Sequence, residues 1–149
     1  MGTVNIIKVM KQVHPESILL VKVGTFYHTY GRDAYIISYL FGYQIKKVEA
    51  NMDTCGFPKS AINKIIKKLE DEKISYITLN RSLNYEVEDQ SNFKTENKYK
   101  DMYNKAHKYL AKKLKIDNIY QYLLENIQEE NIKEKINKIE EILYEVWKV

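Results

Sequence analysis

The periodicity of apolar residues changes near Phe93, and this change constrains the fold more than any other feature of the sequence. Up to residue 92, short apolar runs alternate with turn residues, as is typical of strands and helices in one α/β unit. From residue 93 onward, apolar residues recur only at helical spacing. The sequence therefore predicts an α/β head over residues 1–92 and an all-α C-terminal tail over residues 93–149.

Within the head, turn and cap residues divide the apolar runs into separate elements. The run SILLVKV predicts a buried strand that Gly24 closes. Asp33 is predicted to cap the helix that follows, and Ser60 to cap a later one. Residues 85–92 fit either an edge strand or a loop. The other predicted elements are a helix over residues 4–13 and strands over residues 26–30, 43–49, 52–57 and 75–79.

The tail is predicted to contain three helices. Asp117 is predicted to cap the second and shortest of them. The third carries a heptad pattern over only two repeats, which favours packing on neighbouring helices over a coiled coil. The apolar stripes are Tyr99, Met102, Tyr103, Ala106, Leu110 and Leu114 in the first helix, and Ile132, Ile136, Ile139, Leu143 and Val146 in the third.

The cysteine content and the lack of long apolar segments indicate the cellular compartment. The 149-residue chain has one cysteine, Cys55, which excludes an internal disulfide framework and favours a reducing compartment. The N-terminus has no signal-peptide pattern, and no apolar run approaches the ~18 residues that cross a bilayer. We therefore expect a cytoplasmic protein without a membrane partner.

Charge is distributed unevenly along the chain. The net charge of +4 does not by itself indicate nucleic-acid binding. However, residues 94–115 carry eight lysines against two acidic residues, whereas residues 116–149 carry four lysines against eight acidic residues. A basic segment followed by an acidic one predicts a polarised surface that suits two different partners.

The sequence offers little to a catalytic interpretation. His14, His28, His107 and Cys55 lack the spacing of metal ligands. Ser17 and Ser60 lack the strained turn of a hydrolase nucleophile. No segment resembles a phosphate-binding loop. We expect neither enzymatic activity, nor a cofactor, nor a metal site.

Five motifs occur in a fixed order: HPESILLVKV, GTFYHTYGRDA, YQIKKVE, TCGFPKSA and SYITL. Together they resemble the N-terminal mismatch-recognition domain of the MutS family, over roughly residues 10–80. The resemblance implies a mixed β-sheet flanked by helices. We expect the chain to lack the ATPase, lever and clamp domains of that family, and so to be a short stand-alone MutS-like protein that acts without ATP.

The resemblance also implies candidate site residues. Phe26 matches the family phenylalanine that wedges into the minor groove of DNA. His28 stands where the family has a glutamate that contacts the mispaired base, and Thr25 replaces the preceding aspartate. Lys46 and Lys47 match a basic pair that leads into a loop near DNA. From the residues alone, a core ring is the favoured interpretation of Phe26, and only the resemblance favours a wedge. His28 could equally be a partly exposed histidine without a role.

The predicted basic helix adds a second candidate surface. Lys98, Lys105 and Lys112 recur every seven residues on one flank. This flank could clamp a phosphate backbone, or it could dock the acidic final helix in the same or another subunit.

The expected function is non-enzymatic binding of mismatched or distorted duplex, either DNA or RNA. The resemblance adds an accessory role beside a mobile-element reverse transcriptase. The alternative is a protein-interaction adaptor that acts through the tail, by docking a partner protein or by forming a homodimer. Nucleic-acid affinity and its salt dependence separate the two hypotheses.

Overall fold

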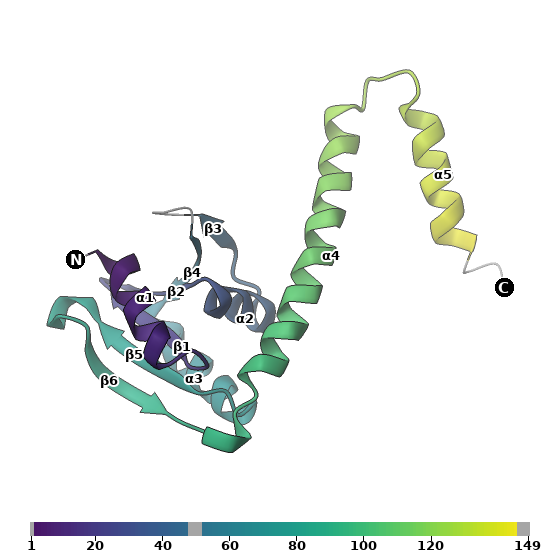
Figure 1. Cartoon of the computed structure of the whole chain (residues 1–149). Helices are drawn as coiled ribbons and strands as arrows, with labels where there is room; N and C mark the ends of the chain where they lie inside the picture. The colour runs from purple at the N-terminus through teal and green to yellow at the C-terminus, as the bar shows by residue number, and fades with distance from the viewer. Residues whose placement is uncertain (1, 48–51, 146–149) are drawn as a thin grey trace. The chain divides into compact units, whose positions relative to one another are not determined.

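The computed structural model describes residues 2–47 and 52–145 (Figure 1). It divides into two compact units, Met1–Leu110 and Ala111–Val149. The predicted architecture, an α/β head with a mixed sheet followed by a helical tail, is confirmed.

The first unit is built on one six-stranded mixed sheet. One pair of neighbouring strands, whose members are far apart in the sequence, is parallel, and the other neighbouring strands pair antiparallel. In spatial order the strands are β3 (Ile45–Lys47), β4 (Asp53–Pro58), β2 (Phe26–Tyr30), β1 (Ile18–Val23), β5 (Tyr76–Asn80) and β6 (Glu86–Ser91).

The β1–β2 hairpin forms where the sequence predicts it. Gly24 and Thr25 are the two turn residues, because Val23 pairs directly with Phe26. Gly24 has φ +62°, a conformation that glycine adopts without strain and that two-residue hairpins require. The ambiguous segment 85–92 contains the edge strand β6, and of the strand predicted over residues 43–49 the structure shows β3, with residues 48 and 49 outside the described residues.

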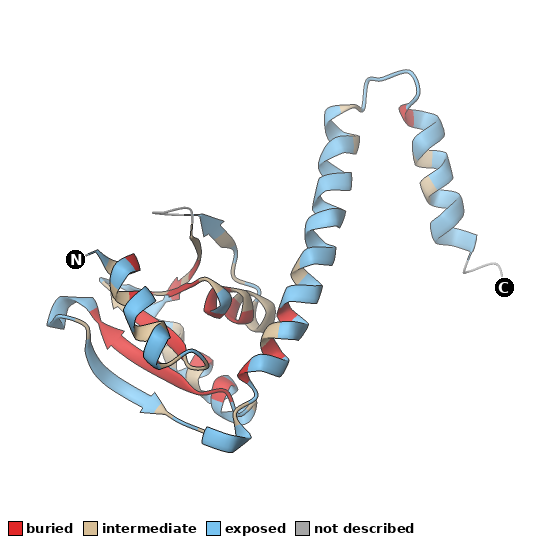
Figure 2. Cartoon of the chain, in the orientation of Figure 1, coloured by how far each residue is buried: buried red, intermediate tan, exposed pale blue. Residues whose placement is uncertain are grey.

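Helices cover both faces of the sheet. Helix α1 (Thr3–Val13) places Ile7 and Met10 against alternate β1 residues on one face. Helices α2 (Arg32–Phe41) and α3 (Ile62–Asp71) cover the other face through their apolar stripes. Figure 2 shows that burial concentrates in the central strands and in the helix sides that contact them.

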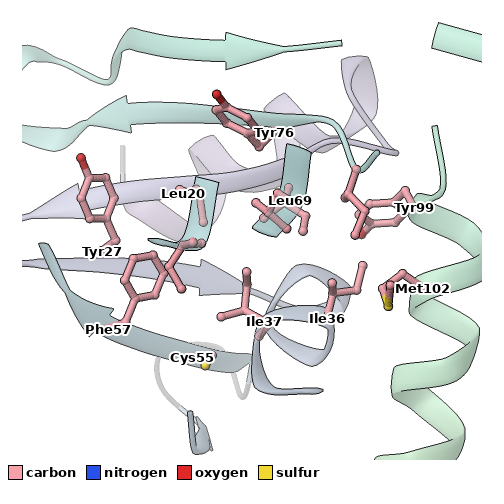
Figure 3. Close-up of a cluster of buried hydrophobic side chains, with 14 residues drawn as sticks. Leu20, Tyr27, Ile36, Ile37, Cys55, Phe57, Leu69, Tyr76, Tyr99 and Met102 are labelled. Atoms are coloured by element: carbon pink, nitrogen blue, oxygen red, sulfur yellow. The ribbon is translucent and has the colours of Figure 1, made fainter. Parts of the chain in front are cut away.

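The start of α4 (Tyr99–Glu125) belongs to the core of the first unit. Tyr99 and Met102 are 2% and 6% exposed and pack with the cluster that includes Ile36, Leu69 and Tyr76 (Figure 3). The helical periodicity thus begins near residue 93 as predicted, but its first turns complete the head rather than a separate tail.

Asp33 does not cap α2, contrary to the prediction. Gly31, with φ +60°, takes the N-cap position, so Asp33 is the second residue of the helix and is fully buried. Its carboxylate accepts hydrogen bonds from Lys11 Nζ at 2.9 Å, from the backbone N–H of Leu19 at 3.0 Å and from Tyr99 Oη at 2.6 Å. The local pattern correctly placed the helix start but missed three partners that come from other elements.

Two further predicted caps are wrong. Ser60 lies in a 3₁₀ turn (Lys59–Ala61) that precedes α3, and its side chain caps nothing. Asp117 lies inside α4, which continues without a break to Glu125. The last glycine or proline in the chain is Pro58, so no residue interrupts this helix and an aspartate alone does not end it.

The second unit contains the rest of α4 and helix α5 (Ile132–Glu145). The α5 stripe predicted from its heptad is partly covered: Ile132 is 7% exposed, whereas Leu143 is 58% exposed. Val146 lies outside the described residues. Across the described ranges, no helix combines the length and the apolarity that crossing a bilayer requires.

Candidate nucleic-acid interface

Alternation along β2 places Phe26, His28 and Tyr30 on one face of the sheet and Tyr27 and Thr29 on the other. Phe26 is the first residue of the strand, directly after the hairpin turn. Its side chain is 47% exposed, whereas Tyr27 is 7% exposed and belongs to the core. Of the two interpretations left open by the sequence, the exposed ring is therefore correct and the core ring is wrong.

His28 lies beside Phe26 on this face. The two ring centroids are 6.5 Å apart and the ring planes are tilted by 39°. Across the β2–β4 pairing, His28 is opposite Gly56, and an added Cβ on Gly56 would lie only 3.3 Å from His28 Nδ1. The absence of a side chain at Gly56 thus leaves room for the imidazole to lie low against the sheet, next to the exposed phenyl ring.

The surroundings of His28 favour its neutral form. Partial burial lowers the pKa of His28 below its ordinary value, and the positive charge of Arg81 lowers it further. A neutral imidazole carries one N–H donor and one acceptor nitrogen. Beside an exposed aromatic ring, this group could hydrogen-bond to either a donor or an acceptor on a base edge.

The structure separates Lys46 from Lys47. Lys46 pairs with Thr54, which also pairs with Tyr30, so Lys46 lies on the face that carries Phe26 and His28. Lys47 pairs with Asp53 and lies on the opposite face, where its Nζ is 2.9 Å from the carboxylate of Asp53. Only Lys46 is therefore placed to extend the surface around Phe26.

A basic cleft on the same side of the sheet was missed by the sequence analysis. It lies between α1 and the end of β2, and Tyr30 forms part of its wall. Alternation on β2 would have placed Tyr30 on the same face as His28, and the helical repeat of α1 would have placed Lys8 and Lys11 on one side of that helix. Its cationic lining residues are Lys8, Lys11 and Arg32.

The lysines of the predicted basic flank are exposed, and the two that belong to the first unit are not part of this face. Lys98 directly precedes α4 and Lys105 lies in its second turn. The buried residues Tyr99 and Met102 of this helix pack on the α2–α3 side of the sheet. Lys112 belongs to the second unit. Lys98 and Lys105 therefore lie away from the sheet face that carries Phe26.

Among the described residues, the cysteine and the possible metal-ligating side chains form no further candidate site. Burial raises the pKa of the Cys55 thiol to about 12, which leaves it protonated and unreactive at neutral pH. Within residues 2–47 and 52–145, no group of three or more His, Cys, Asp or Glu side chains is placed to hold a metal ion.

Comparison with known proteins shows the family of the chain. The model of MutS domain I matches residues 2–77, which include the β1–β2 hairpin and β4. The chain belongs to the MutS domain I family. Similar proteins are two DNA mismatch repair proteins MutS, one from Flavobacterium johnsoniae (39% identical over 64 residues) and one from Porphyromonas gingivalis (37% over 65 residues).

The similarity is confined to the head. Each alignment covers 40% of this chain and 7% of the MutS protein. The domain I match ends at residue 77, so β6, α4 and α5 lie beyond it. Phe26, His28 and Gly56 all lie within the matched residues.

Proposed function

We propose that this protein binds mismatched or otherwise distorted nucleic-acid duplex through the face formed by Phe26, His28 and Lys46. Membership of the MutS domain I family supports a role in DNA recognition. The observation that carries the proposal is the exposure of Phe26, an aromatic ring at the tip of a hairpin with His28 beside it.

Wedge insertion by Phe26 would select defective duplex without reading its sequence. An apolar side chain that enters between base pairs costs a few kcal/mol of unstacking energy, which bending and new contacts offset. This cost is smallest where pairing is already weak, at a mismatch, a bulge or a junction. The exposed ring at the start of β2 is free to make such an insertion without losing core contacts.

Cations towards the other end of β2, on the same face as the wedge, would supply affinity that does not depend on sequence. Lys46 on one side of the β2 residues, and the cleft that contains Lys8 and Arg32 on the other, lie on the Phe26 face. Phosphate contacts of this kind position a protein on a duplex, whereas the wedge and His28 discriminate. In this proposal the protein binds but does not catalyse, and binding needs no ATP.

Replacement of Phe26 by alanine tests the proposal. Duplexes with one mismatch, with one bulged base and with full pairing are compared by fluorescence anisotropy, beside thermal melts of each variant. Because stacking of a base on an aromatic ring contributes ~1–3 kcal/mol, Phe26→Ala is expected to weaken binding to the mismatched duplex by about tenfold or more. Its melting temperature should stay close to that of the natural chain, because the ring is half exposed.

Tyr109→Ala is the matched control, because this ring is 50% exposed and is carried by α4. It is expected to leave binding unchanged. Equal binding of mismatched duplex by the natural chain and by Phe26→Ala would overturn the wedge. A parallel series with RNA duplex and RNA–DNA hybrid identifies the preferred ligand, and a preference for the hybrid would support an accessory role beside a reverse transcriptase.

A further inference from the structure

The second unit exposes far more apolar surface than a two-helix hairpin needs. Scattered exposed apolar residues are normal on soluble proteins, but a helix that is apolar around most of its circumference is usually buried in an assembly. In the described part of this unit, the large apolar side chains at least 45% exposed are Leu114, Ile116, Ile119, Tyr120, Tyr122, Leu124, Ile127, Ile142, Leu143 and Tyr144.

Contact between α4 and α5 uses only part of this surface. The groove between them is lined by Ile119, Tyr122 and Leu123 of α4 and by Ile139 of α5. Tyr122 is fixed there by Lys135, whose Nζ donates to the tyrosine oxygen at 2.5 Å and lies 4.9 Å from the ring centroid. One side of α4 is thus occupied by α5.

Another side of α4 carries a straight apolar stripe. Ile116, Tyr120 and Leu124 follow one another at intervals of four residues and therefore lie along one line of the helix. Given the 3.6 residues per turn, Tyr120 is about 160° around the helix from Tyr122 and about 60° from Leu123, which both line the groove. The three side chains are 65%, 62% and 46% exposed, so α5 does not cover this stripe.

The distribution of charged residues along α4 indicates which partner covers this apolar stripe. In the second unit, the α4 segment begins with Lys112, Lys113 and Lys115 and ends with Glu125, and Glu129 and Glu130 follow. Two such segments side by side in the same direction would bring like charges together. Two segments in opposite directions bring the lysines of each beside the acidic end of the other, which is self-complementary under a two-fold axis.

We propose that the second unit is a dimerisation module in which the Ile116–Tyr120–Leu124 stripe packs antiparallel against the same stripe of a second copy of this chain. Tyr120 lies at the middle of the stripe and would be next to the two-fold axis. Ile116 of each copy then contacts Leu124 of the other. This inference does not depend on nucleic-acid binding, because the stripe and the Phe26 surface are in different units.

Tyr120→Lys in the full-length chain tests the interface. Two lysines beside the axis would repel each other and remove a central apolar contact. The natural chain is expected to sediment as a dimer and Tyr120→Lys as a monomer, with the same helix content by circular dichroism. Gln121→Lys is the matched control: it adds the same charge one residue away, off the stripe, and should remain dimeric. A natural chain that stays monomeric at high micromolar concentration, including one that binds only a different protein, would overturn the proposal.

Cysteine pairs test the antiparallel register. Tyr120→Cys should form a disulfide-linked dimer on mild oxidation, whereas the natural chain should not, because its single Cys55 is buried. A mixture of Ile116→Cys and Leu124→Cys chains should cross-link predominantly between the two variants. Predominant linkage of Ile116→Cys with itself would indicate parallel helices and contradict the proposed interface.

Discussion

Gly56 and His28 lie directly opposite each other on β4 and β2, and the imidazole occupies space that any side chain at residue 56 would restrict. A Cβ at this position would lie 3.3 Å from Nδ1 and 3.4 Å from Cε1 of His28. The position of the ring that faces the proposed ligand therefore depends on a glycine of the neighbouring strand.

Gly56→Ala is expected to weaken binding of mismatched duplex several-fold while the fold is kept. The new methyl group must displace the imidazole by a few tenths of an ångström, but it requires no unusual backbone angle. Anisotropy titrations measure the effect. In a His28→Ala background, Gly56→Ala should cause no further loss of affinity, since the two residues act through one contact. A full additional loss of affinity would show that Gly56 acts independently of His28.

The lowered pKa of His28 predicts a pH dependence of stability. In the unfolded chain the imidazole has its ordinary pKa of about 6.5, whereas in the folded chain the pKa is lower. The unfolded state therefore takes up the proton first as the pH falls, and the stability contributed by the neutral ring is lost below about pH 6.5. The free energy of unfolding should fall less between pH 7 and pH 5 in His28→Gln than in the natural chain, as measured by urea titration at each pH.

His28→Glu should change discrimination rather than fold. A carboxylate on this face repels phosphates, which lowers affinity for every duplex, yet it can accept a proton from a base edge where pairing is defective. We expect a larger ratio of mismatched to paired affinity than in the natural chain. Unchanged affinity together with an unchanged ratio would show that residue 28 does not contact the ligand.

Asp33→Ala is expected to destabilise the protein by about 3–5 kcal/mol. The substitution leaves the half-buried Lys11 ammonium, the Leu19 N–H and the Tyr99 hydroxyl without their shared acceptor. Asp53→Ala is the comparison, because its ion pair with Lys47 has the same 2.9 Å distance but is more exposed, and it should cost about 1 kcal/mol or less. Urea denaturation of both variants measures the difference, and similar losses would contradict the central role of Asp33.

Two truncated chains test whether the head ends near residue 92, as the sequence predicts, or at residue 110, as the structure divides it. A chain that ends after Asn92 lacks Tyr99 and Met102, and removal of a single large buried side chain already costs ~3–5 kcal/mol. A chain that ends after Leu110 keeps them. We expect residues 1–110 to unfold cooperatively and residues 1–92 to melt at a much lower temperature or without a cooperative transition. Equal melting of the two would support the boundary predicted at residue 92.

The β1–β2 hairpin and its exposed face could be predicted because their signals are local. Gly24 marks the turn, and alternation from Phe26 onward determines which side chains share a face. Exposure of Phe26 could not be predicted in this way, because it depends on how far α1 extends over the sheet. The separation of Lys46 from Lys47 likewise follows from the register between β3 and β4.

The role of Asp33 was missed for a related reason. An aspartate near a helix start usually caps the helix, and nothing within a few residues distinguishes a capping aspartate from a buried one. The carboxylate of Asp33 accepts hydrogen bonds from residues that lie 22 and 66 positions away in the sequence. Asp117 was misassigned through the same local rule, applied where no glycine or proline ends the helix.

The hydrogen bond between Asp33 and Tyr99 also bears on how the protein is made. On the ribosome the chain emerges from its N-terminus, so Lys11, Leu19 and Asp33 leave the exit tunnel well before Tyr99 does. The central strand β1 likewise lacks its parallel partner until β5 has left the tunnel. The buried Asp33 carboxylate therefore lacks one of its hydrogen-bond donors until Tyr99, which lies 66 positions later in the sequence, has left the tunnel. During that interval the apolar strands of the head depend on the pace of translation and on chaperones to avoid premature contacts.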